Sequence, residues 1–70
     1  MMTHFDISTL DDEQLIPEKP AAEMLGMSQA WLQRDRWAGA TVPFVRFGRA
    51  VRYRVGTLRS EIRRRTVAAT

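Results

Sequence analysis

The chain has 70 residues, no cysteine, 44% hydrophobic residues and a formal net charge of +3. This length allows one small domain with a modest core, and a chain without cysteine has neither disulfides nor thiolate zinc sites. Its apolar runs are too short to span a membrane, and the N-terminus lacks the basic-then-apolar order of a signal peptide. We therefore expect one cytoplasmic domain that does not contact a membrane.

The charge is divided unevenly along the chain. Residues 1–33 carry six acidic side chains and a single lysine, a net charge of −5, whereas residues 34–70 carry ten arginines and two acidic side chains, a net charge of +8. Arginine suits bidentate contacts with phosphate or guanine. A basic half of this kind is typical of nucleic-acid-binding proteins, and the alternative is a solvated surface with ordinary charge scatter.

The two ends of the chain are expected to be poorly ordered. Residues 1–15 are polar and acidic and predict a flexible arm, and residues 66–70 predict a frayed tail, which leaves residues 16–65 as the folded domain. His4 has no second histidine or cysteine near it, and the acidic run 11–13 lacks the ligand spacing of a calcium loop. We therefore predict neither a metal site nor a cofactor.

Two short helices joined by a tight turn are predicted in the next segment. The first begins between Pro17 and Pro20, because proline is tolerated in a first helical turn, and it runs to about Leu25. Gly26 then ends it, since glycine adopts the left-handed conformation without a Cβ clash. Met27 is expected to be buried between the two helices.

The second helix is expected to run from Ser28 to about Trp37, with Gly39 as its stop signal. The Ser28 hydroxyl is a good N-cap, because it can accept a hydrogen bond from a free backbone N–H one turn along. Leu32 and at least one tryptophan are predicted to lie in the core. Two helices in this order predict a helix-turn-helix, whose second helix can enter the major groove of DNA.

This second helix carries side chains that we expect to contact DNA. They are Ser28, Gln29, Trp31, Gln33, Arg34 and Arg36. Gln29 and Gln33 are four residues apart and share a face, and glutamine can pair with the edge of adenine as arginine does with guanine. Trp31 either packs inward or lies along the sugar-phosphate backbone. The alternative for the polar face is that it is solvated, with Asp35 pairing to an arginine.

Residues 43–54 are predicted to form a β-hairpin, because apolar side chains alternate there with arginines. A three-residue loop over 48–50 pairs Phe47 with Val51 and puts the apolar side chains on one face, whereas a two-residue loop would mix the faces. We therefore predict the three-residue loop. The hairpin arginines expected to contact DNA are Arg46, Arg49, Arg52 and Arg54.

In this register Arg46 lies opposite Arg52, an unfavourable like-charge pair that a bound phosphate would relieve. The alternative is that both side chains splay into water. Arg49 lies at the tip, where an arginine can enter a narrow minor groove with its enhanced negative potential. The hairpin is therefore interpreted as a wing.

A third helix is predicted over residues 56–65. Gly56 is a permissible N-cap, and Leu58 and Ile62 are four residues apart and should face the core. The arginines at 63–65 suit the negative end of the helix dipole. Contact of these arginines with the DNA backbone is an equal alternative.

A helix-turn-helix followed by Gly-Arg-x-Val-Arg-Tyr-Arg and a third helix is a fairly specific pattern. It is carried here by Ala21-Ala22-Glu23-Met24-Leu25-Gly26-Met27-Ser28, Trp31-Leu32, Asp35-Arg36, Pro43-Phe44-Val45-Arg46-Phe47-Gly48-Arg49-Ala50-Val51-Arg52-Tyr53-Arg54 and Leu58. Over about residues 16–62 the chain resembles the excisionase and AlpA-like family of small winged helix-turn-helix proteins, distantly related to MerR-type DNA-binding domains. It departs from the family pattern at Pro20, usually a charged residue, and at Gly56, usually a serine or proline.

The resemblance implies an α+β winged helix-turn-helix and a small, non-enzymatic DNA-binding protein of a phage or mobile element. The first functional expectation is an excisionase, a recombination directionality factor that binds and bends double-stranded DNA and helps a site-specific integrase excise the element. The alternative within this class is a transcriptional regulator, which the fold does not distinguish. The alternative from another class is a protein-interaction module, such as an anti-repressor that uses the acidic arm.

A domain this small makes few contacts, so adjacent copies on DNA would add affinity by proximity. Head-to-tail self-association on the DNA of a bacterial nucleoid is therefore expected. The sequence has no catalytic histidine constellation and no glycine-rich phosphate loop, so an enzyme is not expected. These expectations require that Gln33 and Arg49 lie on the same side of the domain and that Gln33 is not buried.

Overall fold

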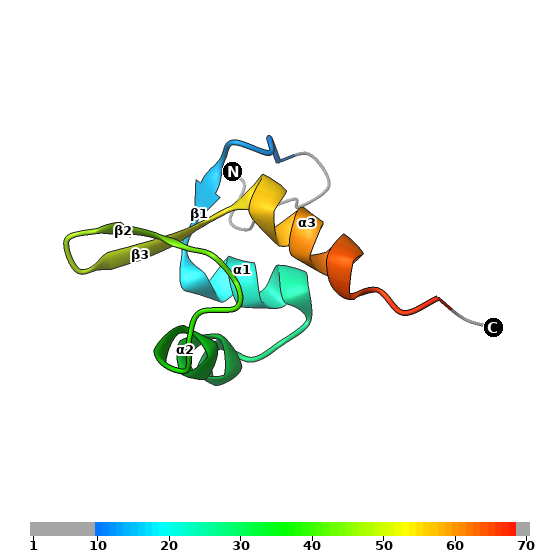
Figure 1. The fold of residues 1–70 in the computed structure, drawn as a ribbon. Coiled ribbons are helices and arrows are strands. Elements are labelled where there is room, and N and C mark those ends of the chain that lie inside the picture. The colour runs from blue at the N-terminus through cyan, green and yellow to red at the C-terminus, as the bar shows by residue number, and fades with distance from the viewer. Residues whose placement is uncertain (1–9, 69–70) are drawn as a thin grey trace.

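The computed structural model describes residues 10–68, which form three helices and a three-stranded antiparallel sheet (Figure 1). In chain order the elements are β1 (Leu15–Ile16), α1 (Glu18–Leu25), α2 (Gln29–Trp37), β2 (Val45–Phe47), β3 (Ala50–Arg54) and α3 (Val55–Arg65). This order confirms the predicted α+β class. His4 and the rest of residues 1–9 lie outside the described residues, as do residues 69–70.

The first described residues are fixed against the centre of the sheet. β1 pairs with β3, Ile16 lying opposite Tyr53, and the strand order is β1-β3-β2. The carbonyl of Gln14 also accepts a hydrogen bond from the N–H of Val55 at 2.9 Å. The prediction of a flexible arm as far as residue 15 is therefore wrong for its last residues, because they satisfy backbone groups of β3 and α3 that would otherwise be unpaired.

The core is assembled from every helix and from one face of the sheet, on which Ile16 and Tyr53 lie opposite each other. Its fully buried members are Ile16, Ala21, Ala22, Leu32, Val42, Tyr53, Val55 and Leu58. The predictions of buried Leu32 and Leu58 are confirmed. Those for Met27 and Ile62 are wrong, since the two side chains are 40% and 42% exposed. Both lie beside an open hollow near the ends of α1 and α3, where no further element covers them within the described chain.

The turn between α1 and α2 is the predicted one. Gly26 has φ +70°, and its N–H donates to the carbonyl of Glu23. The Ser28 hydroxyl caps α2 by accepting a hydrogen bond from the N–H of Trp31 at 3.0 Å. Pro20 is the third residue of α1, where a backbone N–H would lack a helical partner in any case. Its departure from the family pattern therefore leaves the helix intact.

The hairpin has a two-residue loop, Gly48-Arg49, so the predicted three-residue loop and its register are wrong. Phe47 pairs with Ala50, and Arg46 pairs with Val51. Gly48 has φ +59°, the sign that a type II′ turn requires at its first loop position and that matches the twist of the strands.

The apolar side chains of the hairpin consequently do not share one face. Val51 and Tyr53 lie on the face of Arg46, while Phe47 lies on the other face and is 57% exposed. Phe44, just before β2, supplies the aromatic neighbour of Tyr53, with ring centroids 6.2 Å apart. The predicted like-charge pair of Arg46 and Arg52 does not form, and it no longer supports a bound phosphate.

Helix α3 begins at Val55, one residue before the predicted start, with Arg54 at its N-cap position. The predicted N-cap, Gly56, is instead in the first turn and donates its N–H to the carbonyl of Asp12 at 2.8 Å. A Cβ placed on Gly56 would lie 3.0 Å from both the Cβ and the carbonyl oxygen of Asp12. Glycine at this position therefore allows the N-terminal segment to approach α3 closely.

This close approach gives a stability prediction. Gly56→Ala should lower the free energy of unfolding by about 1–3 kcal/mol, because overpacking outweighs the better helix propensity of alanine. Urea unfolding followed by circular dichroism measures the change. Ser60→Ala, at an exposed position of the same helix, is the control and should have a small effect. A Gly56→Ala variant as stable as the wild type would contradict the close packing.

Candidate nucleic-acid interface

A shallow hollow of about 430 Å³ lies between the hairpin and the first turns of α1 and α2. It is lined by Pro17, Glu18, Lys19, Gln29, Arg36, Arg49, Ala50, Val51 and Arg52. Four of these side chains are cationic and one is acidic, so the hollow is basic. The α2 residue Gln29 and the hairpin residues Arg49 and Arg52 thus face a shared space.

Glu18, at the start of α1, is the centre of a polar network on the wall of this hollow. Its Oε2 accepts a hydrogen bond from Arg36 Nη1 at 2.8 Å, and its Oε1 accepts from Gln33 Nε2 at 2.9 Å and from Gln29 Nε2 at 3.4 Å. The same Arg36 nitrogen lies 3.1 Å from the hydroxyl of Tyr53. Three predicted DNA-contacting residues of α2 are therefore held by one carboxylate.

The network shifts the pKa of its members. Burial alone would raise the pKa of Glu18, but the hydrogen bonds from Arg36 and Gln33 outweigh it, and the pKa is lowered from its ordinary value of 4.5. The bond to Glu18 raises the pKa of Arg36. Burial raises the pKa of the Tyr53 hydroxyl. At neutral pH the network therefore consists of a carboxylate, a guanidinium and a neutral phenol.

Gln33 does not lie on the open face of α2 as predicted. It is half-buried, and its amide is bound to Glu18. It nevertheless lies on the same side of the domain as Arg49, since Glu18 contacts Gln33 and lines the hollow with Arg49. Arg36 is more deeply placed, with only 13% of its side chain exposed. Gln29 is exposed and is the glutamine that reaches the hollow.

The outward stripe of α2, which we define as Ala30, Arg34 and Trp37, is exposed. Trp37 is 81% exposed, although the sequence analysis assigned it no contact with DNA. Helical periodicity could have indicated that Trp37 is exposed, because these three positions lie on the side of the helix opposite buried Leu32.

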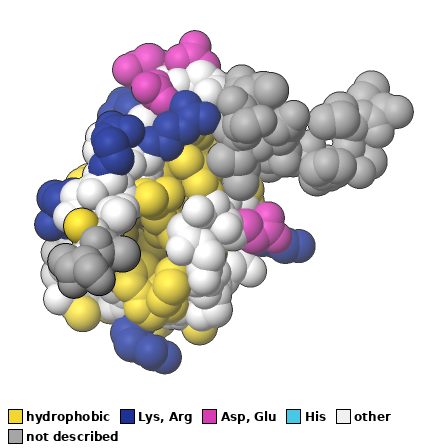
Figure 2. Space-filling model, turned by 90° about the vertical axis from the view of Figure 1, so that its right-hand side faces the viewer, with side chains coloured by type: hydrophobic (Ala, Val, Ile, Leu, Met, Phe, Trp, Pro, Cys, Tyr) yellow, Lys and Arg dark blue, Asp and Glu magenta, His cyan; other side chains and the backbone are white. Residues whose placement is uncertain are grey.

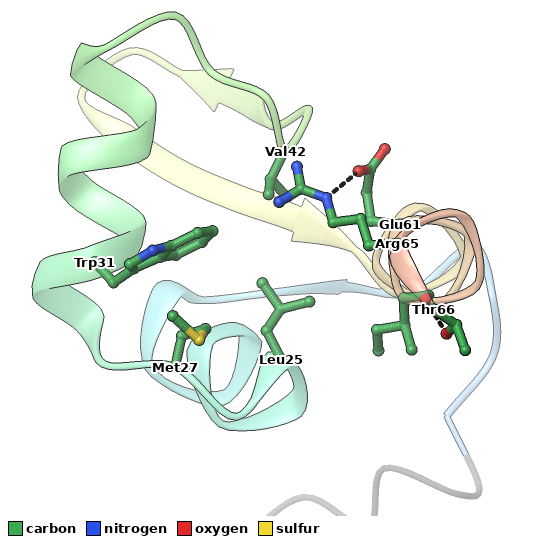
Figure 3. Close-up of a pocket in the computed structure, with 8 residues that line it drawn as sticks. Leu25, Met27, Trp31, Val42, Glu61, Arg65 and Thr66 are labelled. Atoms are coloured by element: carbon green, nitrogen blue, oxygen red, sulfur yellow. Dashed lines mark hydrogen bonds and ion pairs between the residues drawn. The ribbon is translucent and has the colours of Figure 1, made fainter. Parts of the chain in front are cut away.

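The other tryptophan lies on a different side of α2. Trp31 is half-buried and lines an apolar hollow of about 260 Å³ with Leu25, Val42 and Ile62, so the inward alternative is the correct one (Figure 3). Hydrophobic side chains form a band on the face of the molecule turned away from the hairpin (Figure 2). Trp31 therefore does not line the basic hollow between α2 and the hairpin.

The hairpin arginines have different surroundings. The guanidinium of Arg46 lies 5.5 Å from the ring centroid of Phe44, and Arg54 forms an ion pair with Glu13 at 3.5 Å. Arg52 donates to the carbonyl of Val51. Arg49, at the hairpin tip, is exposed and has no ion pair within residues 10–68. It is the hairpin cation most available to a ligand.

Asp35 holds the loop between α2 and β2 and does not pair with an arginine of its own helix. Its carboxylate accepts hydrogen bonds from the Thr41 hydroxyl and, at 3.0 Å, from the N–H of Val42. Burial would raise its pKa, but these bonds lower it from the ordinary value of 3.8. This anchoring fixes the loop that leads into the hairpin at Val42, whose side chain is buried in the core.

The Glu18 network should make folding sensitive to acid. The pKa of Glu18 is lower in the folded chain than in the unfolded chain. The ionised carboxylate therefore stabilises the fold fully above pH 4.5, the ordinary pKa, and this stabilisation is lost as the pH falls through the pKa of the folded chain. Glu18→Gln should cost about 1–3 kcal/mol at neutral pH. It should also flatten the fall in unfolding free energy below pH 4.5, with Asp35 still contributing.

Urea unfolding at several pH values measures this slope. Glu23→Gln removes the same charge from an exposed position of α1 and should keep the wild-type slope. If Glu18→Gln and the wild type lose stability in parallel as the pH falls, the role given to this carboxylate is wrong.

Within residues 10–68 no helix is long and apolar enough to cross a membrane, and no group of three or more His, Asp or Glu side chains could hold a metal ion. No protein-family model, curated protein or solved structure matches the chain. The function must therefore be inferred from the geometry and charge of these residues.

Proposed function

We propose that this chain is a winged helix-turn-helix protein that binds double-stranded DNA. In this proposal α2 enters the major groove with its outward stripe and Gln29, and the hairpin places Arg49 in the adjacent groove. The observation that supports it best is the basic hollow, in which Gln29 of α2 and Arg49 of the hairpin tip line one space. A helix and a hairpin tip that border one space suit a helix in one groove and a wing beside it.

The charges of the described N-terminal segment favour DNA binding over the protein-interaction alternative. Asp12 pairs with Arg59, and Glu13 pairs with Arg54. These acidic side chains are therefore partly neutralised by arginines of the same domain. An acidic arm that recruits a basic protein partner would need them to be available.

The resemblance described above extends the proposal to an excisionase that acts beside a site-specific integrase, with neighbouring copies cooperating on DNA. A transcriptional regulator would use the same surface. Footprinting of the attachment region of the element that encodes this chain would separate them, since an excisionase protects sites beside the recombination junction.

The wing should contribute through its charge. Arg49→Gln should weaken binding to duplex DNA and reduce the slope of log K against log salt by about one, because one phosphate contact is lost. Titrations at about 50 to 200 mM salt measure the slope. Arg63→Gln tests the separate alternative that the arginines at 63–65 contact the DNA backbone, since Arg63 is also exposed but lies at the C-terminal end of α3, on the far side from the hairpin tip (Figure 1). A slope for Arg49→Gln equal to that of the wild type would argue against a wing at this position.

The outward stripe should contribute to sequence preference. Arg34→Ala should lower the discrimination between a selected site and random duplex by about 1–3 kcal/mol, as expected when an arginine contact to a base edge is lost. Competition titrations with the two duplexes measure this ratio. If both affinities fall by the same factor, Arg34 contacts only phosphate and the helix does not read bases through it.

A further inference from the structure

The chemistry of Glu18 suggests a function for it beyond stability. A carboxylate can only accept hydrogen bonds, so an amide that faces it must present its N–H₂ group. Gln33 and Gln29 both do so, at 2.9 and 3.4 Å. A glutamine without such a partner can turn its oxygen or its nitrogen towards a ligand with equal ease. Glu18 therefore removes an ambiguity from two side chains of the proposed recognition helix.

The atoms left over are those that read a base. Each amide uses one N–H towards Glu18, and its carbonyl oxygen and second N–H have no hydrogen-bond partner within residues 10–68. A glutamine reads adenine with this combination, the oxygen accepting from N6–H₂ and the N–H donating to N7. The bonds to Glu18 are therefore compatible with adenine recognition and fix which way each amide faces.

The position of the carboxylate is also unfavourable for binding phosphate. Glu18 lines the basic hollow together with Lys19, Arg49 and Arg52, and it forms an ion pair with the guanidinium of Arg36. Its negative charge opposes the approach of a DNA backbone to this wall. A residue needed only to increase affinity for DNA would not be acidic here.

We propose that Glu18 is a specificity-determining positioning residue, which orients Gln29 and Gln33 to read adenine and lowers the sequence-independent affinity for the DNA backbone. This inference rests on the proposed function. It predicts that removing the charge of Glu18 changes affinity and sequence preference in different directions. Affinity for any duplex should not fall, because the repulsion of phosphate is reduced, whereas the preference for adenine should fall, because the amides lose their fixed orientation.

The test is selection of binding sites from a random duplex library with the wild type, Glu18→Gln and Glu23→Gln. The glutamine introduced at position 18 keeps the shape but can donate as well as accept, so it no longer fixes the neighbouring amides. Wild type and Glu23→Gln should select the same site containing adenines. Glu18→Gln should lose about tenfold of the discrimination at these adenines and bind random duplex at least as tightly as the wild type.

Two further variants keep the test decisive if Glu18→Gln does not fold, which circular dichroism would show. Gln29→Met and Gln33→Met leave the ion pair of Glu18 with Arg36 in place, and each should lose preference for one adenine of the site. Unchanged sites in both methionine variants, or an unchanged preference in a folded Glu18→Gln, would overturn the inference while leaving DNA binding intact. A wild type that binds no duplex would overturn the proposed function together with it.

Discussion

The interaction on which the arrangement of this domain depends is the contact of Glu18 with Arg36 and, through Arg36, with Tyr53. It joins the start of α1, the last turns of α2 and the central strand β3. The two ionic side chains are only 18% and 13% exposed, so removal of either would leave the other charge poorly solvated. The angle between α2 and the hairpin therefore depends on a polar contact as well as on the small apolar core.

A second constraint comes from the N-terminal segment. β1 has only two residues, yet it covers one edge of β3 and leads directly into α1. The backbone of Asp12 then meets α3 at Gly56, so the segment contacts the sheet and the last helix. Its acidic residues also lie close to arginines from the basic half of the chain. The uneven charge of the sequence is thus partly compensated within the fold.

Local signals in the sequence predicted the helices well. The two-helix turn is defined by Gly26, by Ser28 and by the apolar spacing around Leu32. These signals act through local backbone conformation and capping hydrogen bonds, which depend on few distant residues. The hairpin register could not be predicted in the same way. The alternation was assigned to Val45 and Phe47, whereas Phe44 packs near Tyr53, and this choice depends on tertiary contacts.

The sequence predicted which kinds of residue form the candidate site better than it predicted how they are arranged. The sequence indicated a polar helix face and arginines in a hairpin, and Gln29, Arg49 and Arg52 do line one hollow. It did not indicate Glu18, because a single acidic residue at the start of a helix is ordinarily explained by the helix dipole. Which of the two tryptophans packs inward also depended on the packing of α2 against the rest of the domain.

The different surroundings of the two tryptophans give this domain two independent optical reporters. Indole emission depends on the polarity around the ring, and Trp31 is half-buried beside apolar side chains while Trp37 is almost fully in water. With Trp37 replaced by phenylalanine, the remaining emission comes from Trp31 and reports on the packing of the core. With Trp31 replaced instead, it follows events on the surface of α2, so folding and ligand capture can be observed separately without an attached dye.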